Sequence, residues 1–183
     1  MAMKTYISML RGINVGGHKK IKMADLRAMY QALGFSNVAS YVQSGNVVFD
    51  SLESDSAALT TTIETHIETT FGFPVSVFIR DADDFRRIID GNPFAARENV
   101  NPARLFVTFL NQPLSEATTD VLVVPPDSND EFVVAGDVIY LFCPNGSGRS
   151  KLAAAISGNK LRTPSTTRNW NTILALYSMA THE

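Results

Sequence analysis

Apolar residues in the first half of the chain switch between strand and helix spacing, and this order constrains the fold more than any other feature. The helical spacing begins at Met23, and Gly34 favours a helix end. Gly45 beside Asn46 supplies the positive φ angles that a tight hairpin demands. The predicted elements are a strand at 4–10, a helix at 23–33, strands at 38–42 and 47–49, a helix from 54–56 to 71, a strand at 75–79 and a short helix at 81–90. The first six follow the order β-α-β-β-α-β, which is typical of a ferredoxin-like domain.

The second half of the chain begins with the same β-α-β-β order, although the residues themselves show no repetition. Its predicted elements are a strand at 104–110, a helix at 114–122, strands at 132–135 and 138–143, a helix after 149–151, and a last helix that carries Trp170 and begins at a Thr166 or Thr167 cap. The polar segment 95–103 has no apolar period and reads as a linker. We predict an α+β protein with a ferredoxin-like subdomain at 1–94, and a related α/β subdomain at 104–183 that ends in two helices.

Composition is that of an ordinary soluble globular protein, with 45% hydrophobic and 19% charged residues. No apolar run approaches the ~20 residues that span a bilayer, and Met1–Lys4 lacks the layout of a signal peptide. The single cysteine, Cys143, lies in an apolar run and is expected to pack as a small hydrophobe. We therefore expect a cytoplasmic protein with no membrane partner.

Charge is distributed unevenly along the chain. Carboxylates are absent from residues 1–24 and again from 138–182, and these two segments hold ten of the sixteen cations. The segment between them carries six cations against seventeen acids. This asymmetry favours an anionic partner, which would be a small molecule or a nucleic acid, at a surface formed by the two ends. Two solvated basic faces without a ligand would explain the same pattern.

The connection at 10–23 (LRGINVGGHKKIKM) joins the first strand to the first helix and combines three glycines with four cations. In a ferredoxin-like order, this loop and the turn between the second and third strands lie at the same end of the sheet. Exposed backbone N–H groups and a helix start both favour negative charge there. The predicted ligand-binding residues of this half are Arg11, Asn14, Lys20, Gln43, Ser44 and Asn46.

Two later segments repeat this chemistry, since glycine or threonine precedes cations at expected helix starts at 146–151 and 166–171. Cations oppose the dipole at a helix N-terminus, and a bound anion would relieve that conflict. The predicted ligand-binding residues here are Arg149, Ser150, Lys151, Arg168, Asn169 and Asn171. A structural alternative is that the amides at 43, 46, 169 and 171 cap backbone ends and fasten the two halves together.

The glycine-containing segments do not match established phosphate-binding or catalytic motifs. The glycines at 12 and 17 have Walker A spacing, but His18 occupies the lysine position. The segment at 146–151 lacks the third glycine of a dinucleotide loop, and Ser150 beside Lys151 is a weak nucleophile pair because adjacent helical residues do not face each other. Three scattered histidines and one cysteine predict no metal site, and no cofactor is indicated.

Several motifs together resemble a bacterial family catalogued as domain of unknown function 1697: RGINVGG with KIKMADL, GFSNVASYVQSGNVVF, NPF, NGSGRSKL and TTRNWNT. The resemblance covers nearly the whole chain and implies an α/β, ferredoxin-like architecture, but it transfers no reaction. The motif positions that it marks are Arg11, Asn14, Gly16, Gly17, Lys20, Gln43, Ser44, Gly45, Asn46, Arg149, Ser150, Lys151, Thr167, Arg168, Asn169 and Asn171.

Two functions remain open from the sequence. The first is binding of a phosphate-bearing ligand, either a nucleotide or a nucleic acid, by cations from both ends of the chain. The second is an enzyme, a hydrolase or transferase acting on a phosphorylated small molecule, with His18 or Lys20 in proton transfer. The absence of a carboxylate near the expected site weighs against the enzyme.

Overall fold

The computed structural model describes residues 2–183, and their internal contacts divide into two units. Unit 1 comprises the chain up to Arg87 together with Ala175–Glu183, and unit 2 is Ile88–Leu174. The divisions fall inside two helices, α3 (Ala82–Asp90) and α6 (Trp170–Thr181), so each of them contributes to both units. The linker expected at 95–103 and the subdomain bounds around it stay predictions.

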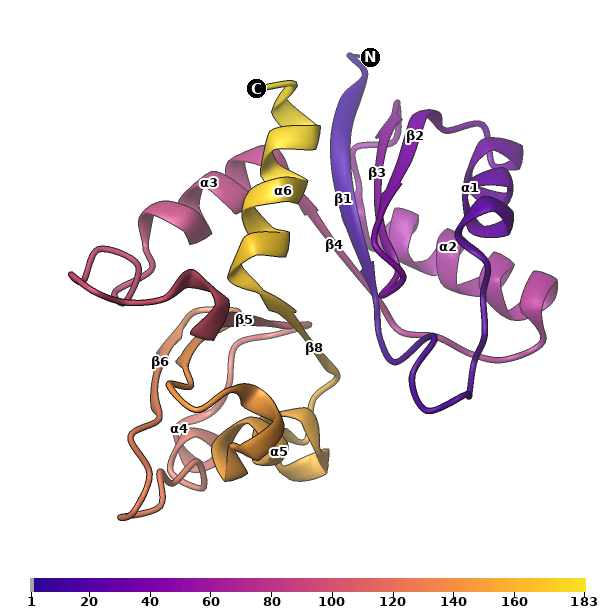
Figure 1. The fold of residues 1–183 in the computed structure, drawn as a ribbon. Coiled ribbons are helices and arrows are strands. Elements are labelled where there is room, and N and C mark those ends of the chain that lie inside the picture. The colour runs from indigo at the N-terminus through magenta and orange to yellow at the C-terminus, as the bar shows by residue number, and fades with distance from the viewer. Residues whose placement is uncertain (1) are drawn as a thin grey trace. The chain divides into compact units, whose positions relative to one another are not determined.

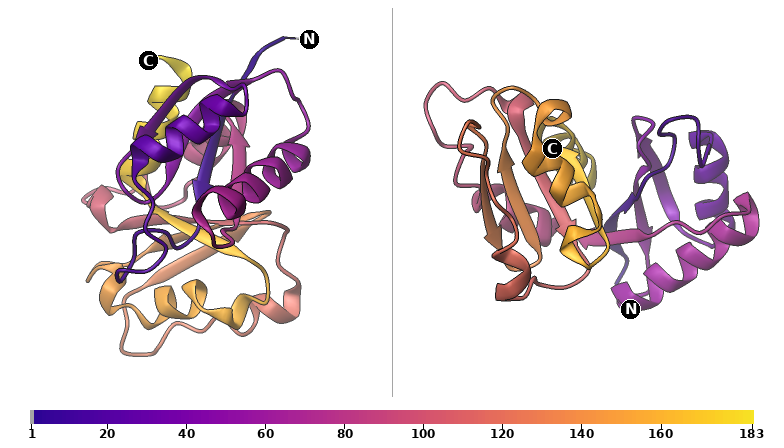
Figure 2. Two further views of the ribbon diagram at one scale, coloured as in Figure 1. Left: turned by 90° about the vertical axis from the view of Figure 1, so that its right-hand side faces the viewer. Right: turned by 90° about the horizontal axis from the view of Figure 1, so that it is seen from below.

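Unit 1 contains one antiparallel sheet of four strands in the order β2-β3-β1-β4 (Figure 1). Helices α1 and α2 lie side by side on one face of this sheet (Figures 1 and 2). The elements are β1 (Lys4–Leu10), α1 (Met23–Ala32), β2 (Ser36–Tyr41), β3 (Asn46–Ser51), α2 (Ser56–Phe71) and β4 (Val77–Asp81). All six predicted elements of the first half are therefore present, with ends displaced by a few residues.

The core of unit 1 forms where the apolar stripes of α1 and α2 face the sheet. The α2 residues at four-residue spacing, Leu59, Ile63 and Ile67, are all buried in this core, as their spacing predicts. Ser8 of β1 is also fully buried, and it shares a 2.8 Å hydrogen bond with the hydroxyl of Tyr30. This bond satisfies two polar groups that burial would otherwise leave unpaired.

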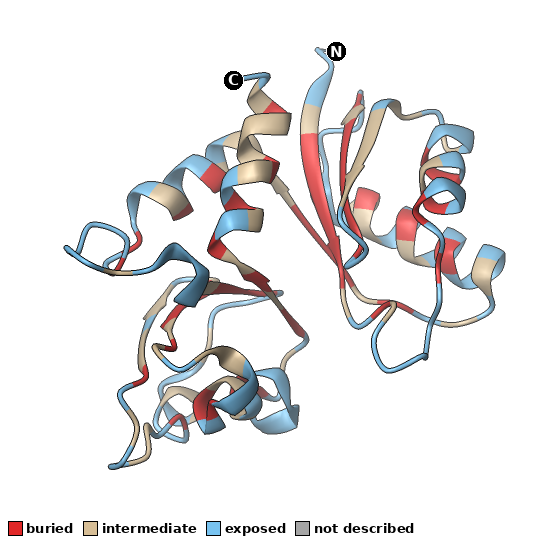
Figure 3. Cartoon of the chain, in the orientation of Figure 1, coloured by how far each residue is buried: buried red, intermediate tan, exposed pale blue. Residues whose placement is uncertain are grey.

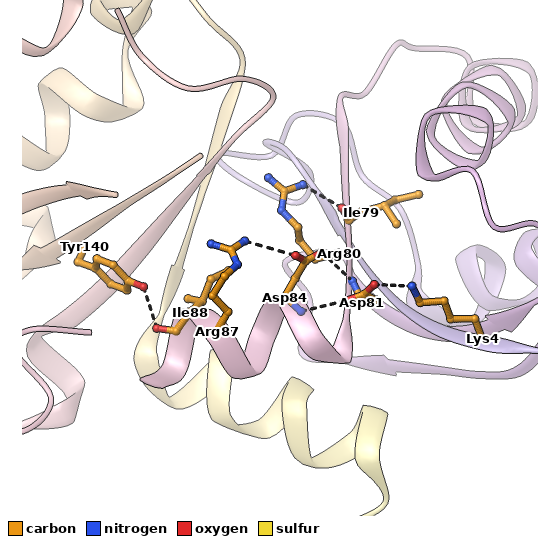
Figure 4. Close-up of polar contacts among 8 residues, drawn as sticks. All are labelled: Lys4, Ile79, Arg80, Asp81, Asp84, Arg87, Ile88 and Tyr140. Atoms are coloured by element: carbon orange, nitrogen blue, oxygen red, sulfur yellow. Dashed lines mark hydrogen bonds and ion pairs between the residues drawn. The ribbon is translucent and has the colours of Figure 1, made fainter. Parts of the chain in front are cut away.

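Aspartates lie at the starts of two helices, α2 and α3. Asp55 caps α2 by accepting a hydrogen bond from Ala57 N at 2.9 Å. Asp81 caps α3, since its carboxylate accepts from Asp84 N at 2.8 Å (Figure 4). Lys4 lies 2.6 Å from the same carboxylate. Burial opposes ionisation of Asp81, but the bonds from Lys4 and from backbone N–H groups outweigh it and lower its pKa.

Unit 2 repeats the sheet arrangement of unit 1. Its four antiparallel strands lie in the order β6-β7-β5-β8, which matches β2-β3-β1-β4 element for element. The elements are β5 (Leu105–Leu110), α4 (Glu116–Thr119), β6 (Glu131–Ala135), β7 (Val138–Phe142), α5 (Lys151–Ser157) and β8 (Ser165–Asn169), with 3-10 turns at Pro102–Arg104, Ser147–Arg149 and Asn159–Leu161. The protein is thus a mixed α/β structure with two four-stranded antiparallel sheets.

Two predictions about unit 2 are wrong. Residues 165–169 form strand β8 and not a loop that caps the last helix, because Thr167 pairs with Thr108 on β5 through a 2.7 Å hydroxyl–hydroxyl bond. The helix expected at 114–122 is only α4, which Ser115 caps by accepting from Thr118 N. The exposed valines at 121 and 123 follow that short helix, and Pro125 comes after them. β-branched residues and proline both disfavour a longer helix.

Burial elsewhere follows the sequence pattern. Trp170 and Cys143 are buried at 5% and 0% exposure, as their apolar surroundings predict. Buried residues make up most of β1, β3, β5 and β7, whereas the loop after β1 is largely exposed (Figure 3). Within residues 2–183, every helix is too short or too polar to cross a membrane.

Candidate functional site

The cationic loop, residues 11–22, is held in place by the side chain of Asn14. Its Oδ1 accepts from Ile21 N at 2.9 Å, while its Nδ2 donates to the carbonyl oxygens of Ile21 at 3.0 Å and Gln43 at 2.7 Å. Asn14 adopts a φ of 55°, in the left-handed region that asparagine tolerates. These bonds bring the loop and the β2–β3 turn together at one end of the sheet, as the strand order predicts.

The β2–β3 turn packs directly against the cationic loop. Leu10 N donates to Gly45 O at 2.9 Å, and Gly45 has a φ of +82°. Asn46 is fully buried, and its Nδ2 donates to Tyr41 O at 3.1 Å and to Ser44 Oγ at 2.9 Å. Asn46 and Ser44 therefore stabilise the turn through these hydrogen bonds.

Two lysines and two amides line one cavity of about 660 Å³ in unit 1, which we name the lysine cavity. Its lining comprises Asn14, Gly17, Lys20, Ile21, Lys22, Asp25, Gln43 and Phe71. It lies at the start of α1, where Lys22 is the N-cap residue and makes no side-chain cap. The N–H groups of Met23 and Ala24 have no acceptor among residues 2–183. The first turn of α1 therefore leaves positive partial charge beside the two lysines, and the carboxylate of Asp25, in the same turn and the same lining, offsets part of it.

A second cavity of about 590 Å³ in unit 1 is lined both by the cationic loop and by carboxylates. Arg11 and Lys19 line it together with Glu64 and Glu68 of α2. Lys19 Nζ donates to Pro74 O at 2.8 Å, and Glu64 accepts from Val77 N at 2.8 Å. The expectation of a site without carboxylates is wrong here. The signal was in the sequence, because glutamates four residues apart share one face of a helix.

Carboxylates also accompany the cations of unit 2. A cavity of about 260 Å³, which we name the aspartate cavity, is lined by Pro125, Asp127, Ser128, Asp130, Asn145, Gly146, Arg149, Ser150 and Lys151. Ser150 caps α5 by accepting from Ala153 N at 2.9 Å. The loop at 144–150 meets the loop that precedes β6, because in this strand order both lie at the end opposite to the β6–β7 turn. The sequence prediction missed Asp127 and Asp130.

The remaining predicted residues make contacts within unit 2. Arg168 lies in β8 and is only 7% exposed, and its guanidinium donates to Thr166 Oγ1 at 2.8 Å and to Thr167 O at 3.0 Å. Burial lowers the pKa of Arg168 to about 10. Asn169 donates to Ala103 O at 3.1 Å and accepts from Asn171 N at 3.0 Å. The side-chain amide of Asn169 therefore caps the start of α6, as the structural alternative expected for this residue.

The twelve predicted binding residues divide equally between the two units. Asn14, Lys20 and Gln43 share the lysine cavity, Arg11 lines its neighbour, and Ser44 and Asn46 lie in the adjoining turn. The residues at 149–151 share the aspartate cavity, and those at 168–171 lie in β8 and at the start of α6. The described part of the chain contains no cluster of three or more His, Cys, Asp or Glu residues arranged to hold a metal ion.

Comparison with known proteins identifies the family and a structural relative. The structure is similar to that of a conserved bacterial protein, SP0830 from Streptococcus pneumoniae, with 26% sequence identity and a TM-score of 0.75. The match covers 98% of this chain and 99% of that one. Comparison with curated proteins gave no match. The family model described as "Protein of unknown function (DUF1697)" matches residues 3–140, so the chain belongs to this family.

Proposed function

We propose that the protein binds a phosphate-bearing ligand in the lysine cavity. The observation that carries the proposal is the meeting of Lys20, Lys22 and the uncapped first turn of α1 at one cavity. Ammonium groups and free backbone N–H groups are donors without acceptor capacity, and both favour a multiply charged oxyanion. The amide side chain of Gln43 adds a group that can bond a neutral part of the same ligand.

The size of the lysine cavity supports a nucleotide more than a nucleic acid. Its volume of about 660 Å³ lies within the range of roughly 300–1,000 Å³ that is usual for small-molecule pockets. The chain has a pI of 5.9, which is low for a protein that binds backbone phosphates over a large surface. The unit 2 cations are left out of this proposal, because Arg149 and Lys151 share their cavity with two carboxylates, whereas Lys20 and Lys22 share theirs with one, Asp25.

Titration calorimetry with ATP, pyrophosphate and a short single-stranded oligonucleotide tests this proposal. We expect ATP and pyrophosphate to bind at low salt and to bind more weakly at high salt. Replacing both Lys20 and Lys22 with Ala should weaken binding about tenfold or more, or about 1.4 kcal/mol, through loss of charge-assisted bonds. Lys160→Ala removes an exposed cation of unit 2 and is the matched control. Equal affinity of the double variant and the wild type would refute the proposal.

A second candidate is an enzyme that acts on a phosphorylated small molecule. The observation that favours it is the second cavity, where Glu64 and Glu68 supply carboxylates beside Arg11 and Lys19. A carboxylate near cations can serve in proton transfer while the cations stabilise developing charge. A phosphatase and nucleotidase screen should then show turnover that Glu68→Gln abolishes and that the exposed control Glu98→Gln leaves unchanged. Turnover that is insensitive to Glu68→Gln would exclude this site.

We further propose that each unit has a ferredoxin-like topology and that the protein is cytoplasmic. The two identical strand orders, each with the β-α-β-β-α-β sequence of elements, support the first statement. The lone buried cysteine supports the second. An experimental structure with another strand order would contradict the topology, and recovery of the protein in a membrane or secreted fraction would contradict the location.

A further inference from the structure

The aspartate cavity of unit 2 contains a carboxylate, that of Asp130, without a partner in the described chain. Asp130 is only 7% exposed and lines the cavity. Its carboxylate accepts no hydrogen bond and makes no ion pair with any of residues 2–183, and only its backbone N–H is bonded, to Ser128 Oγ at 3.1 Å. The carboxylate oxygens are not among the buried polar atoms that lack a partner, so they are accessible from the cavity, where a ligand cation can pair with them.

Groups of opposite charge line the same cavity without pairing. Asp127 and Asp130 stand with Arg149 and Lys151 in one lining, yet the ion pairs found within the described chain do not join them. The carboxylates and the cations of this cavity are therefore both available to bind a ligand. The positive charges count against a bare divalent cation, since they would repel it while only two carboxylates attracted it.

The volume of the cavity limits the size of the ligand, and a nearby thiol bears on its charge. About 260 Å³ is below the roughly 300–1,000 Å³ of pockets that take drug-sized molecules, so the ligand is small. Cys143 is fully buried, and burial raises the pKa of its thiol; a hydrogen bond with Ser150 opposes this shift, and the charge of Asp130 adds to it. The thiol therefore stays neutral at neutral pH and adds no further negative charge beside the cavity.

We propose that the aspartate cavity is a second ligand site, independent of the lysine cavity, that binds a small zwitterion of the α-amino acid class. The ligand ammonium group bonds to Asp130, with Asp127 beside it, and the ligand carboxylate lies toward Arg149 and Lys151. Each ligand charge then meets the opposite charge in a partly desolvated site, where charge-assisted bonds are strongest. The hydroxyl of Ser128 and the amide of Asn145 supply further donors and acceptors.

The test uses the full chain labelled with ¹⁵N and follows the amide signals of the cavity residues in two-dimensional NMR spectra. The proteinogenic amino acids are added one at a time at millimolar concentration. For an amino acid that binds, its analogues without the ammonium or without the carboxylate are compared. If alanine binds, for example, these are propionate and ethylamine. We expect at least one amino acid to shift the signals of Asn145 and Ser150, and each analogue to bind about tenfold or more weakly.

Charge-removing variants assign the binding to the cavity. Asp130→Asn should reduce the affinity about tenfold or more. Asp127→Asn should reduce it as well, and this exposed position does not endanger the fold. Asp120→Asn, at an exposed aspartate outside the cavity, is the matched control and should change nothing. The proposal is overturned if no amino acid shifts these signals, if the analogue without the ammonium binds equally well, or if magnesium or calcium chloride alone produces the shifts that depend on Asp130.

Discussion

Gly45 is the position where a single added carbon should most disturb the packing of the hairpin turn on the cationic loop. A Cβ at this residue would lie 2.7 Å from Cδ1 of Ile13 and 2.8 Å from Cβ of Leu10. Both neighbours are buried, and Leu10 Cβ is attached to the backbone of β1, so it cannot move without shifting the strand. Gly45→Ala therefore introduces a steric clash in addition to an unfavourable backbone conformation.

The expected loss of stability has two parts. A φ of +82° costs an L-residue roughly 1 kcal/mol, and forcing an extra carbon into a packed core costs about 1–3 kcal/mol more. Alanine at Gly45 should therefore lower the free energy of unfolding by roughly 2–4 kcal/mol. Gly34 provides the matched control in the same unit, because its φ is +87° and no described atom lies within 4 Å of the added Cβ. Gly34→Ala should cost only the conformational part, about 1 kcal/mol.

Urea denaturation followed by far-UV circular dichroism measures both variants. The difference between Gly45→Ala and Gly34→Ala isolates the clash with Ile13 and Leu10, since the two glycines have nearly the same φ. We expect this difference to be about 1–3 kcal/mol at unchanged slope in urea. If the two variants lose the same stability, the turn does not pack on the cationic loop as described.

Three further substitutions test separate contacts. Asp81→Asn keeps a helix cap but loses the ion pair with the half-exposed Lys4, so it should cost about 0.5–1 kcal/mol at pH 7. Because the folded pKa of Asp81 lies below its ordinary value of 3.8, that stability is present at neutral pH and is lost as the pH falls through the folded pKa. The difference in acid denaturation curves should vanish there. Tyr140→Phe removes the donor to Ile88 O at 2.9 Å (Figure 4) and should cost about 1–2 kcal/mol in urea denaturation. Asn14→Ala removes the three side-chain bonds that Asn14 makes, and amide hydrogen exchange should accelerate in the cationic loop by about tenfold or more, whereas unchanged exchange would contradict its holding role.

Much of the fold follows from apolar spacing, and α2 shows why. Leu59, Ile63 and Ile67 recur every four residues, and only a helix brings them to one face, where all three are buried. Strand β8 could not be predicted in the same way, because STTRN carries no apolar alternation. The segment is a strand only because β5 offers a partner for it, including the bond between Thr108 and Thr167.

The contacts at the candidate sites were likewise predictable only in part. The approach of Asn14 to Gln43 was predictable, because the order of elements alone places the two loops at one end of the sheet. The aspartates at 127 and 130 were not, since they belong to a loop without a motif and reach the residues at 149–151 only through the fold of unit 2. Counting charges along the chain therefore predicted cationic segments without carboxylates, whereas the folded chain brings carboxylates to both.

The most direct test of the central claim is mapping of phosphate binding on the amide signals of unit 1. Pyrophosphate is added to the ¹⁵N-labelled protein, and the backbone amides of Met23 and Ala24, at the uncapped start of α1, are followed together with those of Lys20 and Lys22. The account predicts saturable shifts centred on these residues that disappear in the Lys20→Ala/Lys22→Ala variant. Shifts that are absent, or that persist unchanged in that variant, would contradict it.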